Sequence, residues 1–177
     1  MSRRIQLALS PPLYAALWDH LLPTNHRVEE AAFVCAAREP TDGADVFRAV
    51  EWLPVPPEGF ETRSAVHFEL TDAMRAAVIK RAHDLGASLV EFHSHTGRWP
   101  AAFSPSDRAG FREFVPHVWW RLKGLPYLAV VVTRSGFDGL AWIAGAQAAE
   151  RLDGILVEEK VLNPTRLSPP EVESYEC

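Results

Sequence analysis

The sequence contains Glu91-Phe92-His93-Ser94-His95 and, eight residues later, Ser104-Pro105-Ser106-Asp107. The lead-in Leu89-Val90-Glu91-Phe92 is mostly apolar, which predicts a strand. Residues two apart on a strand face the same side, so His93 and His95 are expected to project together from its end. Two neighbouring imidazoles in this position suit a divalent metal.

The second stretch predicts the start of a helix. Ser104 can cap the helix, and Pro105 is favoured at the first helical position. Asp107 then falls in the first turn, where the helix dipole stabilises a carboxylate. Two His from a strand and one Asp from a helix give three ligands, which is the arrangement of catalytic zinc; structural zinc usually has four. Each motif alone also has a structural explanation, as a chance His pair and an ordinary capped helix.

The combination resembles the JAB/MPN domain, also called the JAMM metalloprotease family, in its prokaryotic deubiquitinase-like form. The family signature is an upstream Glu, then His-Ser/Thr-His, a short gap and Ser-x-x-Asp. Two features of this chain depart from it. The gap holds eight residues where the family usually has seven, and Thr96 stands where the family commonly has Pro. One extra loop residue costs little free energy and need not move the ligands.

Two acids precede the apolar run of residues 31–37. The run does not alternate, which predicts a strand buried on both faces. The family's Glu precedes such a strand in a pattern like Glu-Ala-Cys-Gly-Leu-Leu, and Glu30 fits that register. Glu29 is one residue out, and a one-residue shift turns a strand side chain to the other face. The resemblance therefore assigns the catalytic role to Glu30, with Glu29 as the alternative; an acid here can also be a solvated strand end.

The resemblance implies a role for each site residue. His93, His95 and Asp107 would hold Zn²⁺. Glu30 would take a proton from the attacking water and pass it to the leaving amine, as general base and then acid. Ser104 would help to stabilise the oxyanion, in addition to capping its helix. The implied reaction is zinc-dependent hydrolysis of an amide.

The substrate class also comes from the resemblance. Family enzymes cleave after the C-terminal glycine of ubiquitin or ubiquitin-like proteins, so the expected function is an isopeptidase or peptidase that deconjugates or processes such a protein. Bacterial members often accompany ubiquitin-type activating and conjugating enzymes. The segment Glu51–Ser64 lies where the family often carries a substrate-gripping insertion; an ordinary proline loop is an equal alternative. The alternative functions are a non-catalytic MPN scaffold and a general metallopeptidase acting on sulfur-carrier-type proteins.

Other metallohydrolases fit the sequence less well. An amidohydrolase barrel needs about 250 residues. A nucleobase deaminase needs a Pro-Cys-x-x-Cys run, which is absent. A metallo-β-lactamase requires Asp two residues after the second His, where this chain has Gly97.

Composition bounds the class of protein. The chain has 177 residues, enough for one domain with a core, and a net charge of −5. We expect no nucleic-acid partner, because there is no basic stripe, and no membrane span, because no apolar run is long enough. The only cysteines are Cys35 and Cys177, which form neither a disulfide framework nor a cysteine zinc cluster. These features are typical of a cytoplasmic protein.

Residues 1–162 are expected to form the JAB/MPN domain, with a flexible C-terminal tail at 163–177. Turn and cap signals predict strands and helices with the following bounds. The strands are 4–9, 31–37, 46–53, 65–70, 89–95, 127–133, 140–144 and 155–162, and the helices are 11–22, 72–85 and 105–115, the last stopped by Pro116. This order predicts an α/β fold with a mixed sheet flanked by helices. The resemblance implies the JAB/MPN (cytidine-deaminase-like) three-layer fold.

Overall fold

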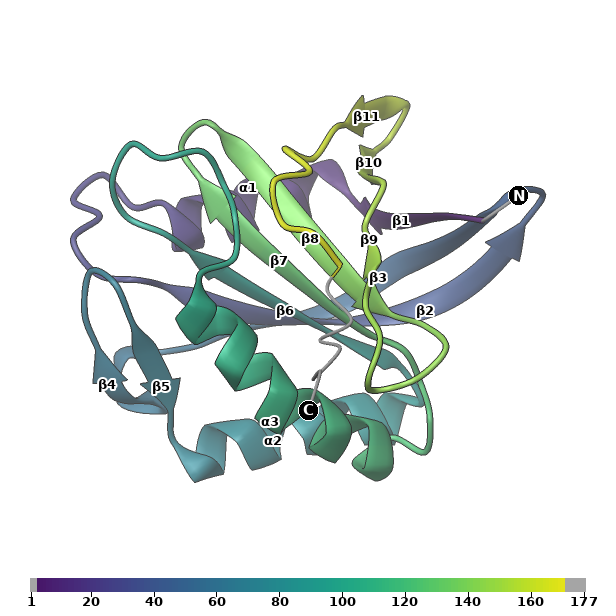
Figure 1. The fold of residues 1–177 in the computed structure, drawn as a ribbon, viewed down its shortest axis with the longest axis horizontal. Helices are drawn as coiled ribbons and strands as arrows, with labels where there is room; N and C mark the ends of the chain where they lie inside the picture. Colours follow the sequence, from purple (N-terminus) through teal and green to yellow (C-terminus); the bar gives the residue numbers. More distant parts are fainter. Residues whose placement is uncertain (1–2, 171–177) are drawn as a thin grey trace, which may run out of the picture.

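The computed structural model describes residues 3–170 (Figure 1). Strands outnumber helices in this range. In chain order the elements are β1 (Arg4–Leu9), α1 (Pro11–Leu21), β2 (Ala31–Thr41), β3 (Ala44–Pro54), η1 (Pro57–Gly59), β4 (Phe60–Arg63), β5 (Phe68–Leu70), α2 (Asp72–Leu85), β6 (Ser88–Ser94), α3 (Pro105–Arg121), β7 (Tyr127–Thr133), β8 (Gly136–Trp142), β9 (Glu150–Arg151), β10 (Gly154–Val157) and β11 (Lys160–Leu162). The predicted α/β class is confirmed.

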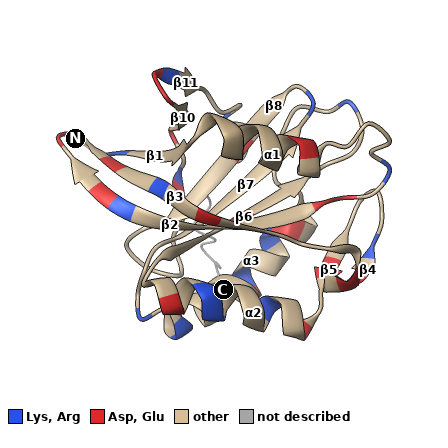
Figure 2. Ribbon diagram, turned by 180° about the vertical axis from the view of Figure 1, so that it is seen from behind, with Lys and Arg blue, Asp and Glu red and all other residues tan. Residues whose placement is uncertain are grey.

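Nine strands form one curled mixed sheet, in the order β11-β10-β1-β3-β2-β6-β7-β8-β9. β6 runs antiparallel to β2 and parallel to β7. β4 and β5 form a separate antiparallel pair beside the main sheet. β2 and β3 are long and extend past their neighbours, and their projecting end is charged (Figure 2). This topology places β6, the strand that ends in the two histidines, near the centre of the sheet.

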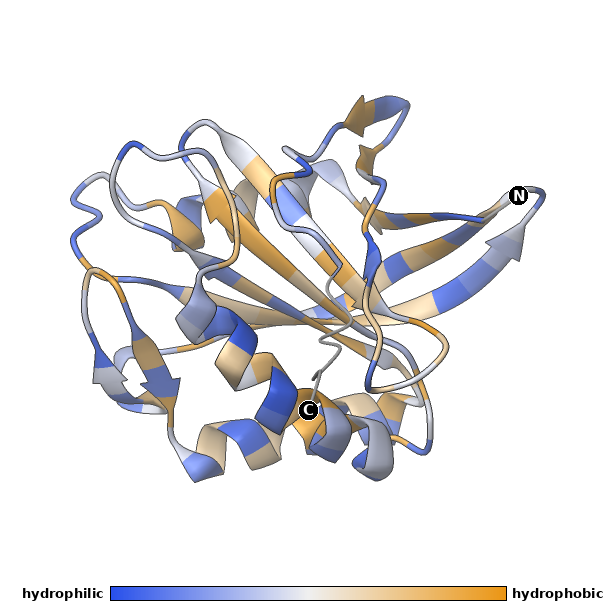
Figure 3. Cartoon of the chain, in the orientation of Figure 1, coloured by the Kyte–Doolittle hydropathy of each residue, from blue (hydrophilic) through white to orange (hydrophobic). Residues whose placement is uncertain are grey.

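Helices cover both faces of the sheet, α1 on one face and α2 with α3 on the other (Figures 1 and 2). The central strands are strongly apolar (Figure 3), because each is buried on both sides. Their side chains alternate between two cores. Phe33 of β2 and Leu89 of β6 pack in the core under α2 and α3, whereas Val34 and Val90 pack in the core under α1. Odd-numbered residues of β2 and β6 therefore share the face that α2 and α3 cover.

Local signals set most helix ends as predicted. The Ser10 and Thr71 side chains cap α1 and α2, and Gly86 ends α2 in a left-handed conformation, with φ +61°. The predicted stop at Pro116 is wrong, because α3 continues to Arg121 with the proline inside it. Val115 and Val118 are fully buried on either side of Pro116. Packing of this face thus offsets the hydrogen bond that a proline removes from a helix.

The C-terminal part of the chain differs from the prediction in two ways. The strand expected over 155–162 is a hairpin of β10 and β11, turning at Glu158. Residues 163–170, predicted as part of a flexible tail, are fixed by hydrogen bonds. The buried carboxylate of Asp138 accepts the backbone N–H of Ser168 at 2.8 Å, and Ser168 Oγ accepts the N–H of Phe103 at 2.8 Å. The rest of that predicted tail, 171–177, lies outside the described residues.

Candidate metal centre

The two histidines leave the end of β6 side by side. His93 is the penultimate residue of the strand, and the N–H of His95 continues the pairing by bonding the carbonyl of Val132 at 3.0 Å. Their Nε2 atoms lie 3.2 Å apart. The His93 side chain is 2% exposed and that of His95 20% exposed, so one imidazole is buried and the other borders the surface. The strand prediction and the shared direction of the two rings are confirmed.

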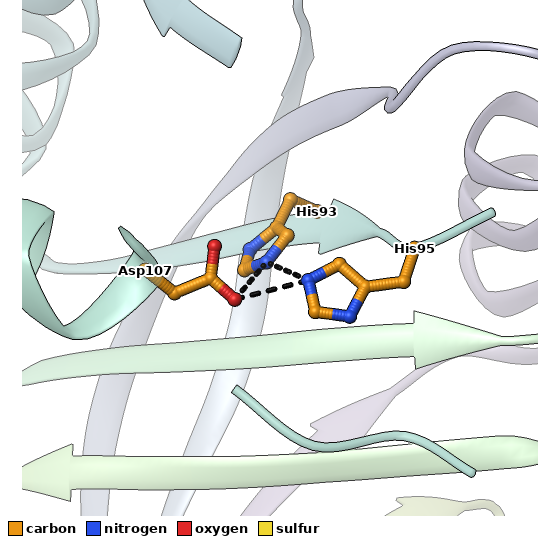
Figure 4. Close-up of side chains that lie close together, drawn as sticks. All are labelled: His93, His95 and Asp107. Carbon is orange, nitrogen blue, oxygen red and sulfur yellow. Dashed lines mark hydrogen bonds and ion pairs between the residues drawn. The ribbon is translucent and has the colours of Figure 1, made fainter. Parts of the chain in front are cut away.

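Asp107 reaches the same point from the first turn of α3 (Figure 4). Its Oδ2 lies 3.0 Å from Nε2 of His95 and 3.2 Å from Nε2 of His93. The three side chains each offer one atom to a common centre, all within 4.8 Å of one another. This cluster can hold a metal ion, as the sequence predicts.

A capping box orients the aspartate. The N–H of Asp107 bonds Oγ of Ser104 at 3.1 Å, and the N–H of Ser104 bonds Oδ2 of Asp107 at 2.8 Å. Pro105 occupies the first turn. The predicted capping role of Ser104 is therefore present, and the same carboxylate oxygen that closes the box faces the two imidazoles.

The electrostatics of the cluster favour a bound cation. Burial by itself raises the pKa of Asp107, but the charge and hydrogen bonds of His93 and His95 hold that pKa far below its usual range. Burial likewise opposes the charge of His93, yet Asp107 raises the pKa of His93 to about 9. The two shifts both arise from attraction between the carboxylate of Asp107 and the facing imidazole of His93. A metal ion supplies the same positive charge at the point where the three ligand atoms meet.

The structure places Glu29, and not Glu30, beside the cluster. Oε1 of Glu29 lies 3.8 Å from Nε2 of His95, and the residue is 3% exposed. Burial raises the pKa of Glu29, and the charges of His93 and His95 oppose that rise. β2 pairs with β6 so that Ala31 lies opposite His93, and Glu29 precedes Ala31 by two residues. Glu29 consequently faces the same side as His93 and His95.

The expectation that Glu30 faces the site is wrong. Its Oε1 accepts a hydrogen bond from Nη1 of Arg63 at 2.7 Å, so its carboxylate ties the start of β2 to β4. The apolar run after it is buried on both faces, so its pattern contains no signal that separates the two registers.

The β4–β5 hairpin borders the cluster. The Phe68 ring lies 5.5 Å from the His93 ring, and Nδ1 of His67 lies 2.9 Å from Oγ of Ser106 at the start of α3. Thr96, in the loop after the histidines, donates its hydroxyl to the carbonyl of Ala65 at 2.8 Å. The segment Glu51–Ser64 thus ends in one strand of a hairpin that lies against the candidate centre, and it is not a plain loop.

The motif has no role for Glu91, the first residue of the stretch Glu91-Phe92-His93-Ser94-His95. Glu91 lies on the same face of β6 as His93 and is 9% exposed. Burial raises the pKa of its carboxyl to about 7, and among residues 3–170 its Oε2 has no hydrogen-bond partner. An acid inside the apolar run of a central strand is the signal that marks it, because glutamate is rarely buried in a protein core.

No family model matches this chain, and no curated protein matches it. Among solved structures, the chain is similar to a protein from Salinibacter ruber (strain DSM 13855) whose structure was determined in solution. The two sequences are 19% identical, the alignment covers 93% of this chain and 95% of that chain, and the TM-score is 0.43. At this level of similarity, neither a fold family nor a function follows.

Among residues 3–170, no helix is both long and apolar enough to cross a membrane.

Proposed function

We propose that this protein is a zinc-dependent isopeptidase or peptidase of the JAB/MPN type, which cleaves after the C-terminal glycine of a ubiquitin-like protein. The observation that carries the proposal is the convergence of His93, His95 and Asp107 on one point, with the carboxylate of Glu29 beside them. A mixed sheet flanked by helices on both faces is compatible with the JAB/MPN fold.

The donor set fits zinc. Ligand atoms around a tetrahedral zinc at 2.0–2.1 Å are about 3.3 Å from one another. The three atoms here are separated by 3.0, 3.2 and 3.2 Å. Two imidazole nitrogens and one carboxylate oxygen leave a fourth position open, which is typical of catalytic zinc, and the partly exposed His95 lies on the accessible side.

Each residue then has a definite task. When bound, zinc supplies Lewis acidity, which activates water and polarises an amide carbonyl. The carboxylate of Glu29 accepts the proton of the attacking water and returns it to the nitrogen of the leaving amine. The cap uses the Ser104 hydroxyl oxygen as an acceptor, so the hydroxyl proton can still be donated to a developing oxyanion. Glu30 and Arg63 fix the hairpin next to this point.

The substrate class is supported by the shape of the surroundings. β4 and β5 form an isolated two-stranded sheet next to the ligands, and such a sheet offers an edge to an extended peptide. A flexible glycine tail is suited to this mode, because glycine brings its backbone close to the catalytic walls. The proposed partners are a ubiquitin-like protein or its conjugates, together with activating and conjugating enzymes of the ubiquitin type. The proposed setting is the cytoplasm, where the free thiol of Cys35 stays reduced.

The test is cleavage of linear fusions in which a short peptide follows the terminal glycine of a ubiquitin-like protein. The zinc-loaded protein is expected to release the peptide, and replacing that glycine by Val should strongly reduce turnover. Asp107→Ala is the matched inactive control. Cleavage of unrelated unfolded peptides, without cleavage of the fusions, would indicate a general metallopeptidase. A zinc-loaded protein that cleaves neither would indicate a scaffold and overturn the proposal.

A further inference from the structure

A cleft of about 640 Å³ opens beside the candidate metal centre, between α2 and α3. β5 forms one end of it, and residues of β6 form its floor. His93 and Asp107 belong to its wall, so the cleft and the metal centre are continuous. The metal ligands account for only one end of this space.

The floor of the cleft contains the carboxyl group of Glu91. The residue is 9% exposed, and its Oε2 has no hydrogen-bond partner among residues 3–170. Tyr127 lowers the pKa of Glu91 through a side-chain hydrogen bond, but a buried carboxylate oxygen that stays unpaired is still costly, and most such atoms are paired in folded proteins. A group that enters the cleft with hydrogen-bond donors supplies the missing partner.

The helix opposite leaves room for an occupant. Gly110 lies inside α3 and lines the cleft, and a Cβ built on it would meet no atom within 4 Å. Glycine in a helix interior costs about 1 kcal/mol relative to alanine. No close neighbour in the described part of this chain excludes a side chain there. Ala109 of α3 and Ala76 of α2 also line the cleft, so both helices present small side chains to it.

The remaining lining residues define the chemistry of an occupant. Apolar walls come from Phe68, Ile79 and Phe114, and they suit an aliphatic stem. The acids of the rim outnumber its arginines: Glu69, Asp72 and Glu113 against Arg75 and Arg121. Arg75 is bonded to Asp72 at 3.3 Å, and its charge also lowers the pKa of Glu91. Apolar walls above a buried acid match a side chain with an aliphatic stem and a terminal cation.

We propose that the cleft is a specificity pocket for a lysine or arginine side chain of the substrate, with its cation placed against Glu91. The substrate role rests on the proposed function, whereas the binding of the cationic side chain does not. Glu91 precedes His93 by two residues on the strand, which separates their Cα atoms by about 7 Å. The recognised residue therefore lies within a few residues of the scissile bond.

The experiment measures binding and not cleavage, so its outcome is independent of whether the amide-hydrolysis proposal holds. The zinc-loaded full chain is titrated with N-acetyl-lysine amide and with N-acetyl-norleucine amide, which has the same stem without the amine, and binding is followed by NMR. Because a hydrogen bond to a charged group is worth about 1.5–3 kcal/mol, the lysine compound should bind roughly ten- to a hundredfold more tightly.

Three variants locate the effect. Glu91→Gln should bring the affinities of the two compounds to within about threefold, because the amide keeps the shape but removes the charge. Gly110→Leu should weaken both compounds, because its side chain fills the space. Glu159→Gln, an exposed acid on the β10–β11 turn, is the matched control and should change neither. Zinc content and circular dichroism establish that each variant is folded. Equal binding of the two compounds by the parent protein, or a lysine preference that survives Glu91→Gln, would overturn the proposal.

Discussion

Asp138 is the residue on which the packing of the C-terminal segment 163–170 depends. Its side chain is 2% exposed, and its carboxylate accepts the backbone N–H of Ser168 at 2.8 Å and that of Gly139 at 3.0 Å. A longer bond of 3.3 Å comes from the N–H of Arg166. Asp138→Ala removes all three acceptor contacts while leaving the donors in place.

The expected cost follows from the two shorter bonds, which are both buried. A buried donor left without a partner costs about 1–3 kcal/mol, so two of them predict a loss of about 4 kcal/mol in the free energy of unfolding. For a domain of this size, 1 kcal/mol lowers Tm by about 2–4 °C. Asp138→Ala should therefore lower Tm by roughly 10 °C. Asp138→Asn keeps one carbonyl oxygen as an acceptor and should lose about half as much.

The assay is thermal unfolding of the zinc-free protein, followed by circular dichroism. Asp19→Ala, at an exposed site on α1, serves as the matched control and should leave Tm within about 2 °C. Asp138→Ala should also weaken zinc retention, because Ser168 fixes the backbone of Phe103, whose ring lies 5.9 Å from that of His93. A drop in Tm of less than about 3 °C would refute the assignment of these bonds as the anchor of the segment.

Three further predictions concern the candidate site and the buried carboxylate of Asp45. Glu29→Gln should reduce turnover by about two to four orders of magnitude without loss of zinc, whereas Glu30→Gln should retain most of the turnover. The reverse result in the cleavage assay would favour Glu30 as the general base, as inferred from the sequence. Asp107→Ala should lose bound zinc by metal analysis, and unchanged zinc content would contradict its role as a ligand. Hydrogen bonds from Arg38 and Arg3 lower the pKa of Asp45, against the effect of burial. The ionised Asp45 therefore stabilises the folded protein above the unfolded-state pKa of about 3.9, and this stabilisation is lost as pH falls through the lower folded-state pKa. Asp45→Asn should accordingly lower stability by about 1 kcal/mol at pH 7 in urea unfolding, with a difference that narrows below pH 4; a difference independent of pH would be evidence against it.

The convergence of His93, His95 and Asp107 was predictable, because the placement of each depends on a rule that acts over a few residues. A period of two places His93 and His95 on one side of a strand, whatever the strand packs against. The capping box of Ser104 and Asp107 likewise closes within one helical turn. The helix end predicted at Pro116 was wrong because contacts with distant parts of the chain outweighed the local rule. A local preference of a few kcal/mol was outweighed by burial of Val115 and Val118, which the sequence near the proline does not reveal.

Only the tertiary structure decided which side of a strand a residue faces and which distant residues come into contact. Residues 31–36 are buried on both sides of the sheet, so their apolar pattern does not indicate whether Glu29 or Glu30 turns toward the histidines. The pairing of Ala31 with His93 shows that Glu29 does. The cleft above Glu91 is lined by residues of α2, α3, β5 and β6, which are separate in the sequence and meet only in the folded chain. The anchoring of residues 163–170 depends on the carboxylate of Asp138, 30 residues away from Ser168. A sequence shows short-range preferences directly, whereas burial and hydrogen bonding between distant segments arise only once the chain has folded.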